Sequence, residues 1–142
     1  PLVEAYAKGW DRGHPIHDVV ACMNSPPFVN FARAVSGCPS ITHVDGHATH
    51  FGRGHYLLRH VDTGDRNERR AAFTLGFSRN WQADWGGLLL FLDGKQDVIN
   101  GFLPRFNVMT VFDGAVMDHN VSAISTFAPK PRLSFAGWFF ER

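Results

Sequence analysis

Hydrophobic residues before position 40 recur at the three- and four-residue spacing of a helix: Leu2, Tyr6, Phe28, Phe31, Ala32 and Val35. The pattern predicts a short helix over residues 1–10. It predicts a clearer helix that begins after Ser25, a residue suited to cap it, and ends at Gly37. Residues 16–23 fit either a helix or an irregular segment. Helices of this kind usually pack against the outside of a sheet.

After residue 39 the pattern changes to short hydrophobic runs separated by Gly, Pro and Asp. The runs cover residues 41–51, 56–61, 71–77, 88–92, 98–103, 107–112, 119–124 and 133–140. Asp45-Gly46 is a turn signal inside the first run. Many short strands at regular spacing predict a mainly β sandwich or barrel. We expect one domain over residues 1–142, with helical support in 1–40 and the β core in 41–142.

Composition narrows the possible partners. The formal net charge of +1 gives no strong attraction for a phosphate backbone, so we expect no nucleic-acid partner. No apolar run reaches the roughly 20 residues of a membrane-spanning helix, and we expect no membrane partner. Cys22 and Cys38 lack a CxxC spacing and fit two reduced thiols in a cytoplasmic protein. The sequence does not indicate an oligomeric state.

The stretch from residue 55 to 62 carries the first candidate chemistry. It ends in His60-Val61-Asp62, and residues two apart on a strand point to the same face, with Cα atoms roughly 7 Å apart. A histidine and a carboxylate placed so can share one metal ion. With eight histidines in the chain, such a pair also arises easily by chance. His119 is the candidate third ligand, because two histidines and a carboxylate on one side of a metal describe a non-haem Fe(II) oxygenase site.

Arg132 and Ser134 form a second pair that would share one strand face. An inward-facing arginine needs an anionic partner, because an unpaired buried charge is very costly. A guanidinium binds a carboxylate through two parallel hydrogen bonds, and a serine hydroxyl can add a third. A ligand carboxylate is one candidate partner. A distant structural carboxylate, or a salt bridge at the surface, is the alternative.

Five motifs then occur in order along residues 41–142: Tyr-Leu-Leu-Arg-His-Val-Asp at 56–62, Gly-Gly-Leu-Leu-Leu-Phe at 86–91, Leu-Pro-Arg-Phe-Asn-Val-Met-Thr-Val-Phe at 103–112, His-Asn-Val at 119–121 and Arg-Leu-Ser-Phe-Ala-Gly-Trp-Phe at 132–139. Together they resemble the 2-oxoglutarate and Fe(II)-dependent oxygenases, and most of all the prolyl 4-hydroxylase branch. Two of the motifs are similar to ribosomal-protein prolyl hydroxylases, and Arg-His-Val-Asp is similar to hypoxia-factor prolyl hydroxylases. The resemblance implies a double-stranded β-helix, a cupin-like jelly roll, buttressed by the N-terminal helices.

The resemblance also implies roles for individual residues. His60, Asp62 and His119 match the catalytic iron ligands, Arg132 matches the residue that pairs with the distal carboxylate of 2-oxoglutarate, and Ser134 matches its hydroxyl companion. The implied cofactors are Fe(II) and 2-oxoglutarate, with ascorbate as a candidate reductant.

Two further features of the resemblance concern glycine and tyrosine. Gly86 and Gly87 match a glycine pair beside the site, where we expect close backbone approach. Relatives often carry a tyrosine that helps hold 2-oxoglutarate at the position of Phe51. Tyr56 lies four residues before His60, so on a regular strand it shares that face and becomes the candidate for co-substrate binding, with a core role as the alternative.

The function implied is a dioxygenase that hydroxylates a substrate C–H, in the first place a prolyl residue of a protein or peptide. A free amino acid or other small molecule is the alternative substrate, and a non-catalytic cupin-like metal-binding protein is the alternative function.

The charged segment 63–70 is the candidate substrate-facing loop, with a solvated loop as the plainer interpretation. Trp81 and Trp85 could stack on a proline ring at the mouth of the site or pack in the core.

Overall fold

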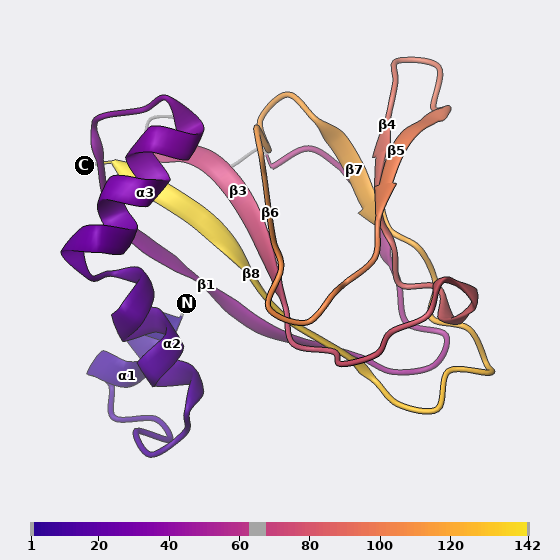
Figure 1. The fold of residues 1–142 in the computed structure, drawn as a ribbon, viewed down its shortest axis with the longest axis horizontal. Helices are drawn as coiled ribbons and strands as arrows, with labels where there is room; N and C mark the ends of the chain where they lie inside the picture. Colours follow the sequence, from indigo (N-terminus) through magenta and orange to yellow (C-terminus); the bar gives the residue numbers. More distant parts are fainter. Residues whose placement is uncertain (1, 63–67, 142) are drawn as a thin grey trace.

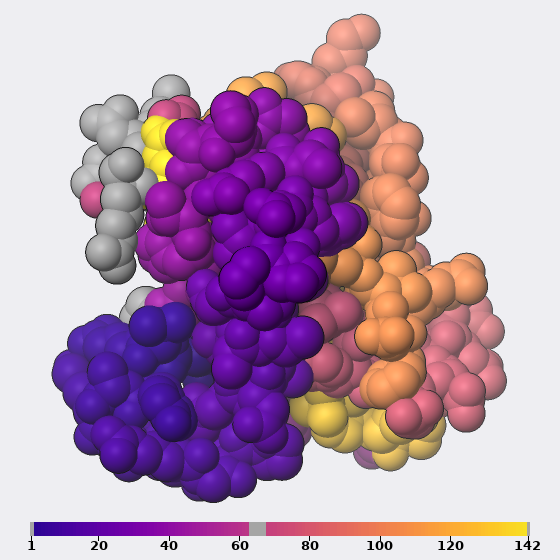
Figure 2. Space-filling view, turned by 60° about the vertical axis from the view of Figure 1, so that its left-hand side comes forward, coloured from indigo at the N-terminus to yellow at the C-terminus, as the bar shows by residue number. Residues whose placement is uncertain are grey.

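The computed structural model describes residues 2–62 and 68–141. Within them, three helices precede eight strands along the chain: α1 is Leu2–Ala7, α2 is Ile16–Met23 and α3 is Pro26–Ser36. The helices lie against the sheet that contains the first strand (Figure 1). Figure 2 shows this N-terminal layer, in indigo and purple, covering one side of the molecule. None of the helices in the described part of the chain is long and apolar enough to span a membrane.

The strands form two antiparallel sheets of four strands each. The first sheet has the order β1 (Ile41–Phe51), β8 (Arg132–Glu141), β3 (Arg69–Gly76) and β6 (Met109–Phe112). The second has the order β2 (Leu57–His60), β7 (Asp118–Val121), β4 (Leu89–Leu92) and β5 (Val98–Phe102), and a 3₁₀ turn, η1 (Ala83–Trp85), precedes β4. The two sheets face each other (Figure 1). The predicted mainly β jelly roll with N-terminal helices is confirmed.

The main core lies between the helices and the first sheet. Phe73, Phe135 and Phe139 are almost completely buried there, and Val29 and Ala32 of α3 pack against them. The apolar stripe predicted for α3 is therefore only partly correct, because Phe31 and Val35 are each about half exposed. The helix begins after Ser25 and ends at Gly37 as predicted, although the side chain of Ser25 makes no capping hydrogen bond.

The turn predicted at Asp45-Gly46 is wrong, because β1 runs through both residues without interruption. Gly46 lies opposite Gly137 of β8, and a Cβ on Gly46 would overlap the backbone of Ala136. The glycine therefore allows two strands to approach closely rather than to turn. The Asp45 carboxylate accepts hydrogen bonds from the N–H groups of Gly46 (2.7 Å) and Val3 (3.2 Å), which ties α1 to the sheet.

Candidate active site

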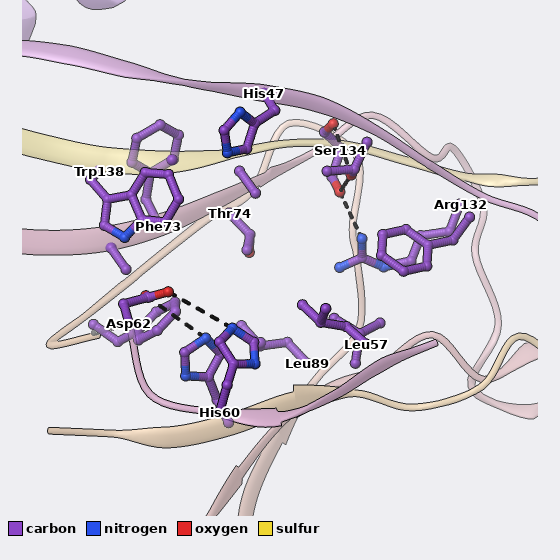
Figure 3. Close-up of a pocket in the computed structure, with 18 residues that line it drawn as sticks. His47, Leu57, His60, Asp62, Phe73, Thr74, Leu89, Arg132, Ser134 and Trp138 are labelled. Carbon is purple, nitrogen blue, oxygen red and sulfur yellow. Dashed lines mark hydrogen bonds and ion pairs between the residues drawn. The ribbon is translucent and has the colours of Figure 1, made fainter. Parts of the chain in front are cut away.

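A cavity of about 350 Å³ lies between the two sheets, lined by residues of β1, β3 and β8 on one side and of β2, β4 and β7 on the other (Figure 3). Most of the lining is hydrophobic: Phe51, Leu57, Phe73, Leu89, Phe112 and Val121. Among the polar residues of the lining, two groups lie at opposite ends. His60 and Asp62 lie at one end, and Arg132 and Ser134 lie at the other. His119 belongs to the first group.

His60, Asp62 and His119 bring three ligand atoms within 4.8 Å of one another. Nε2 of His60 is 3.8 Å from one Asp62 oxygen, and Nε2 of His119 is 3.9 Å from the other. The pairing of β2 with β7 places His119 directly opposite His60. Asp62 lies just beyond the end of β2, where its N–H donates to the carbonyl of Gly114 at 2.7 Å. Gly114 also leaves room for this carboxylate, which a Cβ at that position would overlap.

The other ring nitrogens of the two histidines fix how the imidazoles point. Nδ1 of His60 is 2.8 Å from the carbonyl of Leu58, and Nδ1 of His119 is 2.8 Å from that of Met117. A carbonyl only accepts hydrogen bonds, so each Nδ1 carries a proton and donates it. In the neutral ring, Nε2 then presents a lone pair toward Asp62, as a metal ligand must.

Burial lowers the pKa of His119 from its ordinary value, while its hydrogen bond to Met117 and the charge of Asp62 act in the opposite direction. His119 is therefore neutral at pH 7, the form that binds a metal. Two imidazoles and one carboxylate on one side of a shared point are the donor set of non-haem Fe(II) sites, so these residues fit the ion that the sequence suggests.

Arg132, at the other end of the cavity, is only 3% exposed. Its Nε donates to the carbonyl of Gly87 (2.9 Å) and its Nη1 donates to Oγ of Ser134 (2.7 Å). The ring of Phe51 lies 5.6 Å from the guanidinium carbon. Burial lowers the pKa of Arg132 to about 10, which still leaves it a cation at pH 7.

The charge of Arg132 has no carboxylate partner in residues 2–62 and 68–141. Of its five N–H groups, two are used by the contacts to Gly87 and Ser134. A buried guanidinium with unused donors is costly, and an anion that enters the cavity would remove that cost. Within the described residues, neither the distant structural carboxylate nor the surface salt bridge considered from the sequence is found.

Gly86 and Gly87 allow the close approach expected of them. Both have positive φ, at 68° and 67°. A Cβ on Gly87 would lie 2.5 Å from Ile124 and 3.0 Å from Cδ of Arg132. Glycine at position 87 thus lets the backbone carbonyl reach the arginine.

Tyr56 does not lie in the cavity, contrary to the placement expected from its spacing. It is 58% exposed and precedes β2, which begins at Leu57. The pairing of β2 with β7 is irregular between Leu57 and His60, so Leu57 lines the cavity together with His60. The four-residue spacing therefore does not bring Tyr56 to the side of His60.

Other residues considered from the sequence lie in different settings. Trp81 is 8% exposed and packs edge to face with Trp85 in a second, smaller core, which supports the core interpretation of this pair. Five residues of the candidate substrate-facing loop, 63–67, lie outside the described residues. Cys22 and Cys38 are free cysteines.

The sequence interpretation missed Thr49, which lines the cavity and contacts Ser134. The signal was present, because residues 49 and 51 alternate on β1 and Phe51 also lines the cavity. A single threonine in a strand carries too little information to be selected without its cross-strand neighbour.

A family model described as the 2OG-Fe(II) oxygenase superfamily matches residues 46–140. The chain belongs to this superfamily. Membership implies Fe(II) and 2-oxoglutarate as the cofactors of the family and confirms the family that the sequence motifs resemble. Among curated proteins, none matches the sequence of this chain.

Solved structures share the fold of this chain. A Pseudomonas putida prolyl-4-hydroxylase is 22% identical, with a TM-score of 0.69, over 87% of this chain and 65% of that protein. An oxidoreductase of the 2OG-Fe(II) oxygenase family from Burkholderia pseudomallei is 12% identical, with a TM-score of 0.68, over 87% and 57%. A Trichoplax adhaerens prolyl hydroxylase, in complex with a hypoxia inducible factor peptide fragment, is 18% identical, with a TM-score of 0.55, over 83% and 60%. The chain thus spans less than two thirds of each of these proteins, and the likeness is one of fold.

Proposed function

We propose that this oxygenase binds Fe(II) through His60, Asp62 and His119, anchors 2-oxoglutarate on Arg132 and Ser134, and hydroxylates a prolyl residue of a protein or peptide. One observation carries the proposal: a single cavity holds a metal-ligand triad at one end and, at the other, a buried arginine that has no carboxylate partner in residues 2–62 and 68–141. A dicarboxylate that binds the metal with one end and a cation with the other needs both the triad and the arginine. A simple metal-binding cupin has no use for the arginine.

The residues of the chain bind and orient in this proposal. The carbonyls of Leu58 and Met117 hold the two imidazoles with Nε2 toward the metal position. Gly87 and Ser134 fix the plane of the Arg132 guanidinium, so its remaining N–H groups are set for a carboxylate. The hydrophobic walls keep water from the space between the two ends, which strengthens both sets of polar contacts.

Fe(II) and 2-oxoglutarate supply the oxidation: one oxygen atom of O₂ enters the substrate as hydroxyl, and the other enters the succinate that forms as 2-oxoglutarate loses CO₂. The prolyl substrate is supported by the prolyl hydroxylases that share the fold, one of which was solved with a peptide. Ascorbate, as a reductant, would keep the iron in the ferrous state.

The test is succinate release by the Fe(II)-loaded protein with a panel of proline-containing peptides, with free proline and with no substrate. Each reaction is run with and without ascorbate, and products are weighed for the addition of one oxygen atom. A peptide that gains oxygen in step with succinate release supports the proposal. Oxygen gained only by free proline or another small molecule moves the substrate to that class. Stable iron binding without 2-oxoglutarate binding or succinate release refutes the enzyme and favours the cupin-like binding protein.

A further inference from the structure

Thr49 of β1 lies directly opposite Ser134 of β8 and lines the same cavity. Its Oγ1 is 2.6 Å from Oγ of Ser134 and 3.1 Å from the backbone carbonyl of Ser134. Ser134 is 2% exposed, and its Oγ also receives the hydrogen bond from Nη1 of Arg132. Thr49, Ser134 and Arg132 therefore form a chain of hydrogen bonds at the cation end of the cavity. Figure 3 shows Ser134 and Arg132 of this chain.

The number of protons in this chain limits how it can be arranged. A hydroxyl has one proton to donate and two lone pairs that accept. Arg132 can only donate, so it occupies one lone pair of Ser134 Oγ. Either Thr49 donates to the carbonyl of Ser134 and accepts the proton of Ser134, or Thr49 donates to Oγ of Ser134. The second arrangement fills both lone pairs of Ser134 and frees its proton for another acceptor.

We infer that Thr49 is a positioning residue of the carboxylate subsite, holding Ser134 so that its hydroxyl proton points at a carboxylate bound by Arg132. The inference rests on the proposed function, because the carboxylate is that of 2-oxoglutarate. Switching between the two arrangements needs only rotation of two hydroxyl groups about their C–O bonds. A hydroxyl that accepts two hydrogen bonds is also a stronger donor, since neighbouring hydrogen bonds polarise one another. Phe51, two residues along β1, has no hydroxyl with which to share this task.

Replacing Thr49 by valine keeps the shape of the side chain and removes the donor. A methyl group would then stand where Oγ1 is now, 2.6 Å from Ser134 Oγ, which is closer than carbon and oxygen normally approach. Ser134 must move away, and its bond to the carboxylate weakens. We expect the dissociation constant of 2-oxoglutarate to rise about threefold to tenfold, the effect of one neutral hydrogen bond.

The experiment measures binding rather than turnover. 2-Oxoglutarate is titrated calorimetrically into the Mn(II)-loaded protein. The wild type is compared with Thr49→Val, Thr49→Ser, Ser134→Ala and the double variant Thr49→Val/Ser134→Ala. Thr42→Val is the matched control, because Thr42 lies on the same strand but outside the cavity. Melting curves of each variant establish that it is folded. If a variant that carries Thr49→Val does not fold, Thr49→Ala takes its place.

The inference predicts that Thr49→Ser and Thr42→Val bind 2-oxoglutarate nearly as the wild type does, whereas Thr49→Val binds it more weakly. In the Ser134→Ala background, Thr49→Val should have no further effect, because Thr49 acts through Ser134. Wild-type affinity in Thr49→Val, or an equal loss with and without Ser134, overturns the inference and leaves the proposed function standing. Failure of the wild type itself to bind 2-oxoglutarate overturns both.

Discussion

Arg132→Lys is the substitution that best separates a co-substrate anchor from a structural residue. The arginine donates to Gly87 and Ser134 through two different nitrogens, and this leaves its remaining N–H groups for a ligand. Lysine keeps the positive charge but has one ammonium group in place of the planar fork. It cannot hold both neighbours and also present two parallel donors to a carboxylate.

The size of the effect follows from the lost contact. A hydrogen bond to a charged group contributes roughly 1.5–3 kcal/mol, and each 1.4 kcal/mol is about a tenfold change in affinity. We therefore expect the half-saturating concentration of 2-oxoglutarate to rise about 10- to 100-fold. Without ligand, the variant should lose about 1–2 kcal/mol of stability, because one lysine ammonium group replaces the two arginine nitrogens that donate to the Gly87 carbonyl and to Ser134 Oγ.

The assay combines 2-oxoglutarate titration with melting curves of the ligand-free protein. Arg53→Lys is the matched control, because Nε of Arg53 also donates to a backbone carbonyl, that of Ala128 at 2.8 Å, but outside the cavity. The control should bind 2-oxoglutarate as the wild type does. If Arg132→Lys melts at a lower temperature but binds 2-oxoglutarate unchanged, Arg132 is structural and the anchor role is refuted.

Three further predictions concern the metal end and the glycine that supports the arginine. His119→Ala should abolish iron retention, measured as metal per protein after desalting, whereas His50→Ala, an exposed histidine outside the cavity, should retain it. Protons compete with iron for imidazole, so iron affinity should fall as pH falls. Because burial lowers the pKa of His119, protonation of this ligand should weaken iron binding only below its ordinary pKa of 6.5. An iron affinity that is flat from pH 8 to pH 5 would contradict histidine ligation. Gly87→Ala should lower the free energy of unfolding, measured with denaturant, by about 1–3 kcal/mol and weaken 2-oxoglutarate binding, because φ of residue 87 is 67° and the added Cβ would press on Arg132. In the control Gly94→Ala the added Cβ meets no neighbour, so stability and 2-oxoglutarate binding should both be unchanged.

Local sequence was sufficient to predict where the strands lie, because each is a short hydrophobic run bounded by its own turn residues. The short spacing of His60 and Asp62, and that of Arg132 and Ser134, pointed to two polar groups that the structure places in one cavity. For Arg132 and Ser134 the reason is that residues two apart share a strand face whatever the strand pairs with, whereas Asp62 lies just beyond the end of β2.

Tertiary structure alone decided what depends on pairing between distant strands. The register of β2 with β7 sets His119 opposite His60, and the irregularity in that same pairing leaves Tyr56 outside the cavity. Gly46 suggested a turn until β8 was seen beside it, and the alternation of Thr49 with Phe51 was too weak a signal to select Thr49 until Ser134 was seen 2.6 Å away. A strand encodes which of its residues share a face, but register and close approach arise only when two strands meet, so contacts across the sheets could not be derived from either strand by itself.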